Sequence, residues 1–176
     1  MMEVALVREG IHSTANGEIH FWLSENIIRD RFTLVFLPGL TADHRLFERQ
    51  IGYFQSRYNV LVWDAPGHAA SWPFELSFSL MDEARWLEEI LRAQGVEHPV
   101  LIGQSMGGYV AQAYCELYPD RIKGFVAIDS APVCQPGRPR IPHAGRGDGS
   151  KPDVPHSLSG AAHLRRKGPR RIVHSV

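Results

Sequence analysis

Short apolar runs alternate along this chain with longer stretches in which apolar residues recur every three or four positions. A run of this kind predicts a strand covered on both faces, and the recurring pattern predicts a helix with one apolar stripe. Strands and helices that alternate in this way are typical of a mostly parallel sheet flanked by helices, the α/β class. The predicted strands cover residues 4–8, 18–23, 32–37, 59–63, 100–102 and 124–129.

Three helices are predicted between these strands. The first begins near Thr41 or Asp43, and either residue type can cap a helix. The second begins at Ser79, which forms a capping box of the Ser-x-x-Asp kind with Asp82. The third follows the fifth strand directly and ends before Pro119. The expected apolar stripes of the first two helices are Leu46, Phe47, Ile51 and Phe54, and Leu80, Ala84, Leu87 and Leu91.

The fifth strand ends in a Gly-x-Ser-x-Gly sequence, with Ser105 at its centre and Gly103 and Gly107 on either side. A strand that stops at a serine and becomes a helix makes a tight turn, and small flanking residues let the two segments pass each other. The turn lifts the hydroxyl above the sheet and directs the first helical amides toward a group bound there. The pattern therefore predicts a nucleophilic serine; a structural glycine-rich turn is the alternative.

Over residues 18–131 the chain resembles the α/β-hydrolases, because four segments occur in the order known from that family. The resemblance implies an α/β-hydrolase fold truncated after about the sixth strand. It also implies a serine hydrolase that cleaves an ester or related acyl bond of a small molecule through an acyl-enzyme on Ser105. The oxyanion hole would be the backbone amides of Leu40 and Met106, and no metal or organic cofactor is implied. The four segments are Phe36–Leu40, Asp64–Ser71, Gly103–Gly108 and Tyr118–Gly124.

A serine nucleophile also needs a basic histidine and an acid that orients it, and in this family both follow the sixth strand. Asp129 ends the last predicted strand and is the candidate acid; the alternative is a turn-forming aspartate. Asp64 and His68 are an alternative acid and base, but the resemblance implies that their loop is structural. No histidine is assigned as the base. His143, His156, His163 and His174 follow the last strand, whereas His12, His20 and His44 are scattered and His98 precedes the fifth strand.

The composition changes near Ala131. Residues 1–130 hold 10 Lys and Arg against 17 Asp and Glu, whereas residues 131–176 hold 9 against 2. All 17 aromatic residues precede the boundary, and 7 Pro and 6 Gly follow it. Such a segment cannot bury enough apolar surface to fold by itself. We therefore expect a hydrolase core over residues 1–131 and a disordered basic tail, rich in Pro, Gly and Arg, over residues 132–176.

Two alternatives follow from this boundary. A shifted reading frame or a truncated gene product would leave an inactive hydrolase remnant that lacks the catalytic histidine and acid. The basic run Leu164–Arg171 would instead contact nucleic acid or acidic lipid. The tail has no aromatic side chain to stack on bases, so we do not expect a nucleic-acid partner.

Further expectations concern partners and location. A sixth strand without a neighbour would be an exposed apolar edge, which predicts self-association. The chain has no run of about 18 apolar residues, so we expect no membrane span. Its first residues lack the basic and then apolar pattern of a secretory signal. Two cysteines, Cys115 and Cys134, form no disulfide framework, which favours a reducing cytoplasm.

Overall fold

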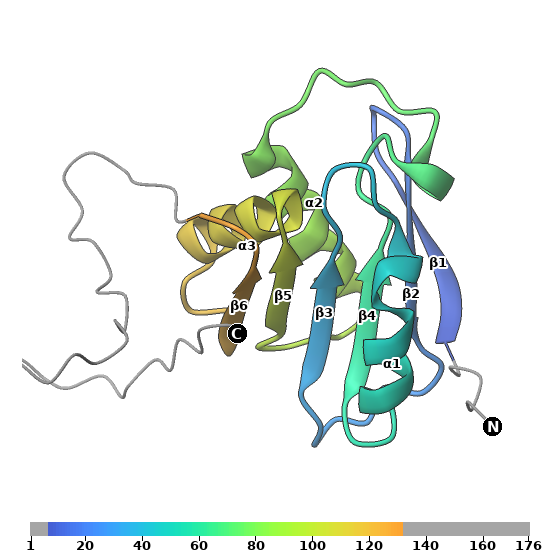
Figure 1. The fold of residues 1–176 in the computed structure, drawn as a ribbon, viewed down its shortest axis with the longest axis vertical. Helices are drawn as coiled ribbons and strands as arrows, with labels where there is room; N and C mark the ends of the chain where they lie inside the picture. The colour runs from blue at the N-terminus through green and yellow to red at the C-terminus, as the bar shows by residue number, and fades with distance from the viewer. Residues whose placement is uncertain (1–6, 132–176) are drawn as a thin grey trace, which may run out of the picture. The chain divides into compact units, whose positions relative to one another are not determined.

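The computed structural model of this protein describes residues 7–131, in which six strands form one mixed sheet (Figure 1). The strands lie in the order β1-β2-β4-β3-β5-β6. β1 is antiparallel to β2 and β2 to β4, whereas the other neighbours are parallel. The predicted α/β class, with a mostly parallel sheet, is confirmed. The strands are β1 (Val7–Ser13), β2 (Glu18–Ser24), β3 (Thr33–Leu37), β4 (Asn59–Trp63), β5 (Val100–Gln104) and β6 (Gly124–Ile128).

Helices cover both faces of this sheet (Figure 1). Helices α2 (Leu80–Ala93) and α3 (Met106–Leu117) lie on one face, and α1 (Glu48–Phe54) lies on the other. Two short 3-10 helices, η1 (His44–Phe47) and η2 (Ala69–Ser71), lie in the loops after β3 and β4. Within residues 7–131, no helix combines the length and the apolar character that a membrane span requires.

The core lies on both sides of β3 and β4, which are buried at every position. Side chains alternate between the two faces of a strand, so β4 contributes to two apolar clusters. Leu61 and Trp63 belong to the cluster that includes residues of α2 and α3, and Val60 and Val62 belong to the cluster around Phe47. Burial on both faces explains why these strands are apolar throughout.

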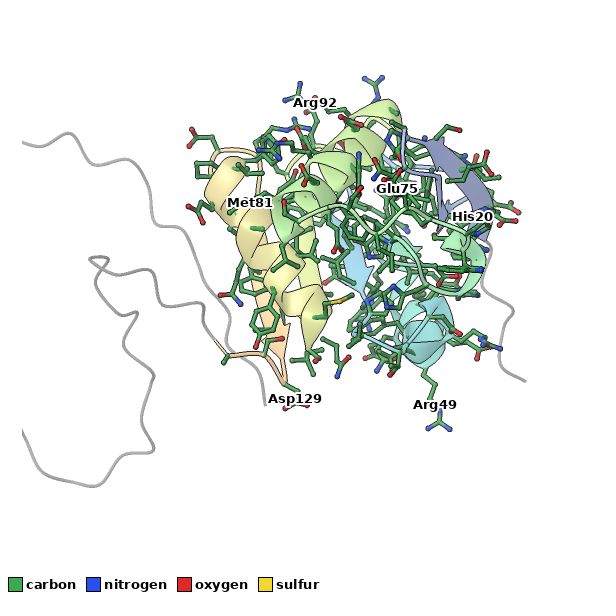
Figure 2. All side chains as sticks on the ribbon, turned by 90° about the horizontal axis from the view of Figure 1, so that it is seen from above. His20, Arg49, Glu75, Met81, Arg92 and Asp129 are labelled. Carbon is green, nitrogen blue, oxygen red and sulfur yellow. The ribbon has the colours of Figure 1, made fainter. Side chains whose placement is uncertain are left out.

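Parallel strands end at the same edge of a sheet, so the loops after β3, β4, β5 and β6 gather there. Figure 2 looks down on this edge, with Asp129 at the rim beyond β6. The residues predicted for chemistry, Leu40, Ser105, Met106 and Asp129, all follow the carboxyl ends of strands. The order of the strands therefore brings together segments that are more than 80 positions apart in the sequence.

The first helical segment differs from its prediction at two points. It begins as the 3-10 helix η1, and the Asp43 side chain caps it by accepting a hydrogen bond from the amide of Arg45. Thr41, the other candidate cap, has a φ of 74° and lies before the helix. Leu46 is 46% exposed rather than buried, because a 3-10 turn shifts residues relative to an α-helical stripe.

Three further expectations need correction. β1 runs over Val7–Ser13 rather than residues 4–8, of which 4–6 lie outside the described residues. Leu80, the first residue of α2, is 37% exposed instead of buried. β6 is half-buried along its length instead of fully buried, since it pairs only with β5 in the described part of the chain. The predicted boundary at Ala131 stays a prediction, because residues 132–176 lie outside the described residues.

Candidate active site

Ser105 occupies the turn between β5 and α3 and has φ 49° and ψ −115°. A positive φ is uncommon for a residue with a side chain and costs free energy unless the surroundings hold it in place. Two hydrogen bonds do so: the Ser105 amide donates to the carbonyl of Ile128 at 2.9 Å, and the Ser105 carbonyl accepts from the amide of Gly108 at 2.9 Å. The predicted strand–serine–helix turn is therefore present.

The glycines beside Ser105 are required by close backbone contacts. A Cβ at Gly103 would collide with the carbonyl of Gly107, and a Cβ at Gly107 would collide with the carbonyl of Leu37. Both contacts are between backbone segments, which cannot move aside as a flexible side chain could. The first turn of α3 therefore packs directly on the ends of β3 and β5, which fixes the position of Ser105 above the sheet edge.

The loop after β3 lies against this turn. A Cβ at Gly39 would lie 3.1 Å from the Cβ of Ser105 and would collide with the side chain of Gln104. The next residue, Leu40, is 60% exposed. In the described part of the chain, neither the amide of Leu40 nor that of Met106 donates to a backbone carbonyl. Both predicted oxyanion donors therefore belong to segments that meet at Ser105.

Ser130 contributes to this turn, although sequence reasoning did not identify it. Its hydroxyl donates to the carbonyl of Ser105 at 2.7 Å, and its side chain fills the space beside Gly108. The bond ties the end of β6 to the turn and stabilises the strained residue. A serine two positions after a strand has no distinctive sequence pattern, so no signal in the sequence could have revealed this role.

Asp64, which directly follows β4, is hydrogen-bonded to His44 and not to His68, although His68 is closer in the sequence. Its side chain is fully buried and accepts hydrogen bonds from the amide of His44 at 2.7 Å, the His44 ring at 3.0 Å and the amide of Ala70 at 3.0 Å. The His44 ring also stacks on Trp22, with ring centroids 3.6 Å apart. These contacts join the loops after β3 and β4, as expected of a structural carboxylate.

The described residues do not supply a histidine that contacts Ser105. Asp129 directly follows β6, has a φ of 51°, is exposed and has no hydrogen bond to a described histidine. The candidate histidines His143, His156, His163 and His174 lie outside the described residues. The described histidines have other partners: His12 contacts Glu89, His20 contacts Glu9, His44 contacts Asp64, and His68 contacts the carbonyl of Pro66, whereas His98 precedes β5.

Residues 7–131 contain no group of three or more side chains able to hold a metal ion. Cys115, in α3, is a free thiol in this part of the chain, and burial raises its pKa to about 11. Such a thiol is protonated at neutral pH and is a poor nucleophile.

Comparison of this chain with known proteins identifies its family. A model of the alpha/beta hydrolase fold matches residues 33–155, which is more than half of the chain. The chain belongs to the α/β-hydrolase fold family. The match includes β3, the turn at Ser105 and β6, and it runs past Ala131 into residues outside the described part.

Individual relatives of this α/β-hydrolase chain differ in their reactions. The 2-(acetamidomethylene)succinate hydrolase of Mesorhizobium japonicum is 27% identical over 102 residues, which cover 58% of this chain and 37% of the relative. A 1-acylglycerol-3-phosphate O-acyltransferase of Arabidopsis thaliana is 30% identical over 104 residues, which cover 56% and 25%. The crystal structure of a bacterial membrane phospholipase A has a TM-score of 0.65 at 28% identity and covers 77% and 43%. The chain therefore spans less than half the length of these three relatives.

Proposed function

We propose that this protein is a serine hydrolase that cleaves an ester or related acyl bond of a small molecule through an acyl-enzyme on Ser105. The observation that carries the proposal is the strained Ser105, held at φ 49° between β5 and α3, with the backbone of Gly39 close beside it. Strain of this kind persists where the surrounding structure holds it, and it is common at sites of chemistry.

The proposed reaction has two stages. The Ser105 oxygen attacks the acyl carbonyl carbon while a base accepts the hydroxyl proton, and the negative charge that develops on the carbonyl oxygen is stabilised by the amides of Leu40 and Met106. The leaving group departs with a proton, and an ester of Ser105 remains. Water then attacks this ester by the same route and releases the acid, which restores the serine hydroxyl.

This proposal also needs a base and an acid that orients it, and residues 7–131 offer a candidate for the acid alone. His12, His20, His44 and His68 have other partners and His98 precedes β5, so the proposal leaves the histidine base unassigned, with Asp129 as the candidate acid. A serine protease that relies on the same pairing of serine and histidine loses about a millionfold in turnover when its histidine is removed. The base is therefore the requirement that decides whether this chain is active.

A second candidate function is favoured by the fact that no histidine within residues 7–131 contacts Ser105. In this alternative the chain is an inactive member of the family, a truncated or frame-shifted remnant that keeps the turn at Ser105 but has no catalytic histidine and acid. Reading the coding DNA in the other two frames beyond Ala131 examines its origin. A hydrolase-like continuation in another frame would favour the remnant, and the lack of one would argue against a shifted frame.

Labelling with a fluorophosphonate separates the two functions, because this probe reacts with activated serines. We expect an adduct on Ser105, located by mass spectrometry of the purified chain, and none in Ser105→Ala. Ser130→Ala is the matched control: it removes a hydroxyl that touches the turn and should slow labelling without abolishing it, since the nucleophile remains. A folded wild-type chain that gives no adduct would refute the hydrolase proposal and favour the remnant.

A further inference from the structure

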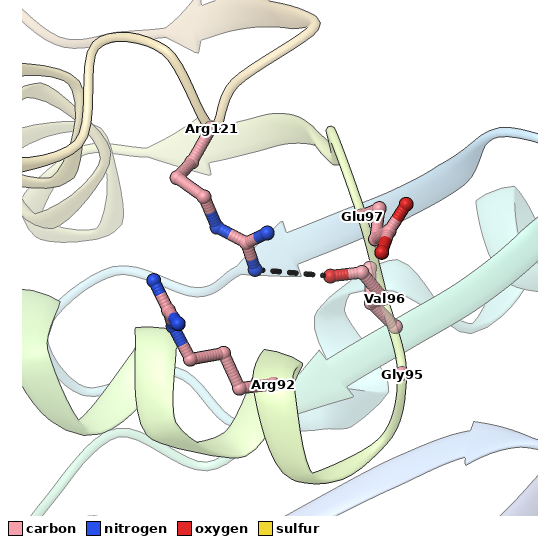
Figure 3. Close-up of a pocket in the computed structure, with 5 residues that line it drawn as sticks. All are labelled: Arg92, Gly95, Val96, Glu97 and Arg121. Carbon is pink, nitrogen blue, oxygen red and sulfur yellow. Dashed lines mark hydrogen bonds between the residues drawn. The ribbon is translucent and has the colours of Figure 1, made fainter.

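A pocket opens at the end of the sheet opposite to Ser105. It has a volume of about 280 Å³ and is lined by Arg92, Gly95, Val96, Glu97 and Arg121 (Figure 3). Its floor is the connection between α2 and β5, whereas Ser105 follows the carboxyl end of β5. The five residues of β5 span roughly 15 Å, so a ligand in this pocket would not reach the reacting serine.

Two arginines in the pocket are anchored by a single buried carboxylate, that of Glu88 on α2. The Nε of Arg92 donates to Oε1 of Glu88 at 2.6 Å, and the Nε of Arg121 donates to the same oxygen at 2.8 Å. The hydroxyl of Tyr114 donates to the other oxygen at 2.5 Å. Burial alone would raise the pKa of Glu88, but these three hydrogen bonds lower it, so the carboxylate is ionised.

The shared oxygen holds the two guanidinium groups close together. Their Nε atoms cannot be farther apart than the sum of the two hydrogen-bond lengths. Like charges at this separation repel each other, and Glu88 carries only one negative charge against their two positive charges. Tyr114 stays neutral because burial and the neighbouring carboxylate raise its pKa. One positive charge therefore remains unbalanced within this group of side chains, of which Glu88 is buried and Arg92 is exposed.

The arginine nitrogens that do not bind Glu88 face the pocket. Figure 3 shows Arg92 extending from α2 and Arg121 extending from the segment before β6, with their guanidinium groups directed toward the same space. Nη2 of Arg121 reaches the carbonyl of Val96 at 3.4 Å. Within residues 7–131, both terminal nitrogens of Arg92 and Nη1 of Arg121 donate to no protein acceptor. Three donors are thus available to a ligand with several acceptor oxygens.

Other charged groups surround this site. Glu97 is exposed and lies beyond the Val96 carbonyl in Figure 3, so water screens much of its charge. Arg8 lies on the neighbouring surface, where its Nη2 donates to the side chain of Gln94 at 2.6 Å. Asp120 precedes Arg121 in the sequence and is exposed. Of these groups only Glu97 lines the pocket, where its charge weakens the attraction for an anion.

We propose that this pocket binds a phosphate group, either inorganic phosphate or the phosphate of a small monoester, between Arg92 and Arg121. A phosphate offers several strong acceptor oxygens, and arginine forks bind it through two parallel N–H···O bonds. The ligand would relieve the repulsion between the guanidinium groups and would link the end of α2 to the segment before β6. This site is independent of the chemistry proposed for Ser105.

Titration calorimetry of the full chain with inorganic phosphate tests the proposal, with sodium chloride of equal ionic strength as the blank. We expect saturable binding with a dissociation constant at or below about 1 mM. Arg92→Gln should weaken it at least about fivefold, because one charge-assisted donor pair is lost. Glu97→Gln should tighten it about twofold by removing a rim charge. Glycerol phosphate in place of phosphate distinguishes a monoester ligand from the free ion by its tighter binding.

Arg85→Gln is the matched control, because Arg85 is an exposed arginine on the same helix that pairs with Asp82 instead. It should leave phosphate binding unchanged, and so should Ser105→Ala. Arg92 is 64% exposed, so its replacement should leave the fold intact. No saturable heat up to about 10 mM phosphate, or equal binding by wild type and Arg92→Gln, would overturn the proposal. Equal binding would assign the heat to other basic residues, such as those after Ala131.

Discussion

The carboxyl group of Glu83 lies on the buried face of α2, only 4% of the residue is exposed, and its Oε2 has no hydrogen-bond partner among the described residues. Burial disfavours the charged form and raises the pKa of this carboxyl to about 7. Between pH 4.5 and 7 the folded protein therefore retains a proton that the unfolded chain has released. Folding stability falls as the pH rises through this interval and levels off above it.

We expect Glu83→Gln to remove this pH dependence and to stabilise the protein at pH 8 by roughly 3 kcal/mol, because glutamine does not ionise. Thermal or urea unfolding at pH 5 and pH 8 measures the effect. Glu75→Gln replaces an exposed carboxylate and should leave the dependence intact (Figure 2). If wild type and Glu83→Gln lost the same stability between the two pH values, the buried carboxyl would not be the cause.

At the scale of single residues, the sequence predicted those whose roles depend on local geometry. Ser105 and its flanking glycines form a pattern that a tight strand–helix turn requires, and the structure has that turn. Ser130 and Glu83 carried no such signal. The Ser130 hydroxyl reaches a carbonyl 25 positions away, and the burial of Glu83 depends on how α2 packs on the sheet. Contacts of this kind are determined by tertiary packing, so one sequence does not reveal them.

Among the elements, α2 has a well-defined start. The amide of Asp82 donates to the Ser79 hydroxyl at 3.3 Å, and the amide of Ser79 donates to the Asp82 carboxylate at 2.9 Å, which completes the predicted capping box. Replacing a capping serine by alanine typically costs about 1 kcal/mol, because a helical amide loses its acceptor. We expect this loss of unfolding free energy for Ser79→Ala in urea denaturation.

Ser77→Ala is the control for the capping experiment. Ser77 is also exposed and also donates to a nearby carboxylate, that of Glu75 at 2.9 Å, but it precedes the helix and caps nothing. Its replacement should change the free energy of unfolding by only a few tenths of a kcal/mol. Equal losses from the two substitutions would mean that the capping box contributes no particular stability to α2.

The elements were predicted best where burial alone determines the pattern. β3 and β4 are apolar throughout because both faces are covered, and their predicted and observed ranges differ by one residue at most. β1 was misplaced because it lies at the edge of the sheet and is mostly polar: Val7 and Ile11 are its two large apolar residues, and Ile11 is exposed. An edge strand is specified by pairing with its neighbour, here β2, and that pairing is not visible in its own residues.

At the scale of the whole molecule, β6 is the edge strand of the described sheet that bears on assembly. Ile128 accepts the Ser105 amide, so its backbone faces β5, and by alternation the N–H and C=O of Ala127 face away from β5. Within the described residues no strand occupies that side. An unpaired edge is a template for another chain, so self-association stays a prediction, and sizing of the 176-residue chain tests it.

We expect the 176-residue chain to elute in sizing chromatography as a dimer or larger species, in a proportion that grows with concentration. Ala127→Pro should shift it toward monomer, because proline removes the outward N–H while leaving the inward hydrogen bonds of Val126 and Ile128 to β5. Circular dichroism of this variant verifies that the sheet is retained. A monomeric wild type would contradict the prediction and indicate that the outer side of β6 is covered within one chain. Association that persists unchanged in folded Ala127→Pro would place the contact elsewhere.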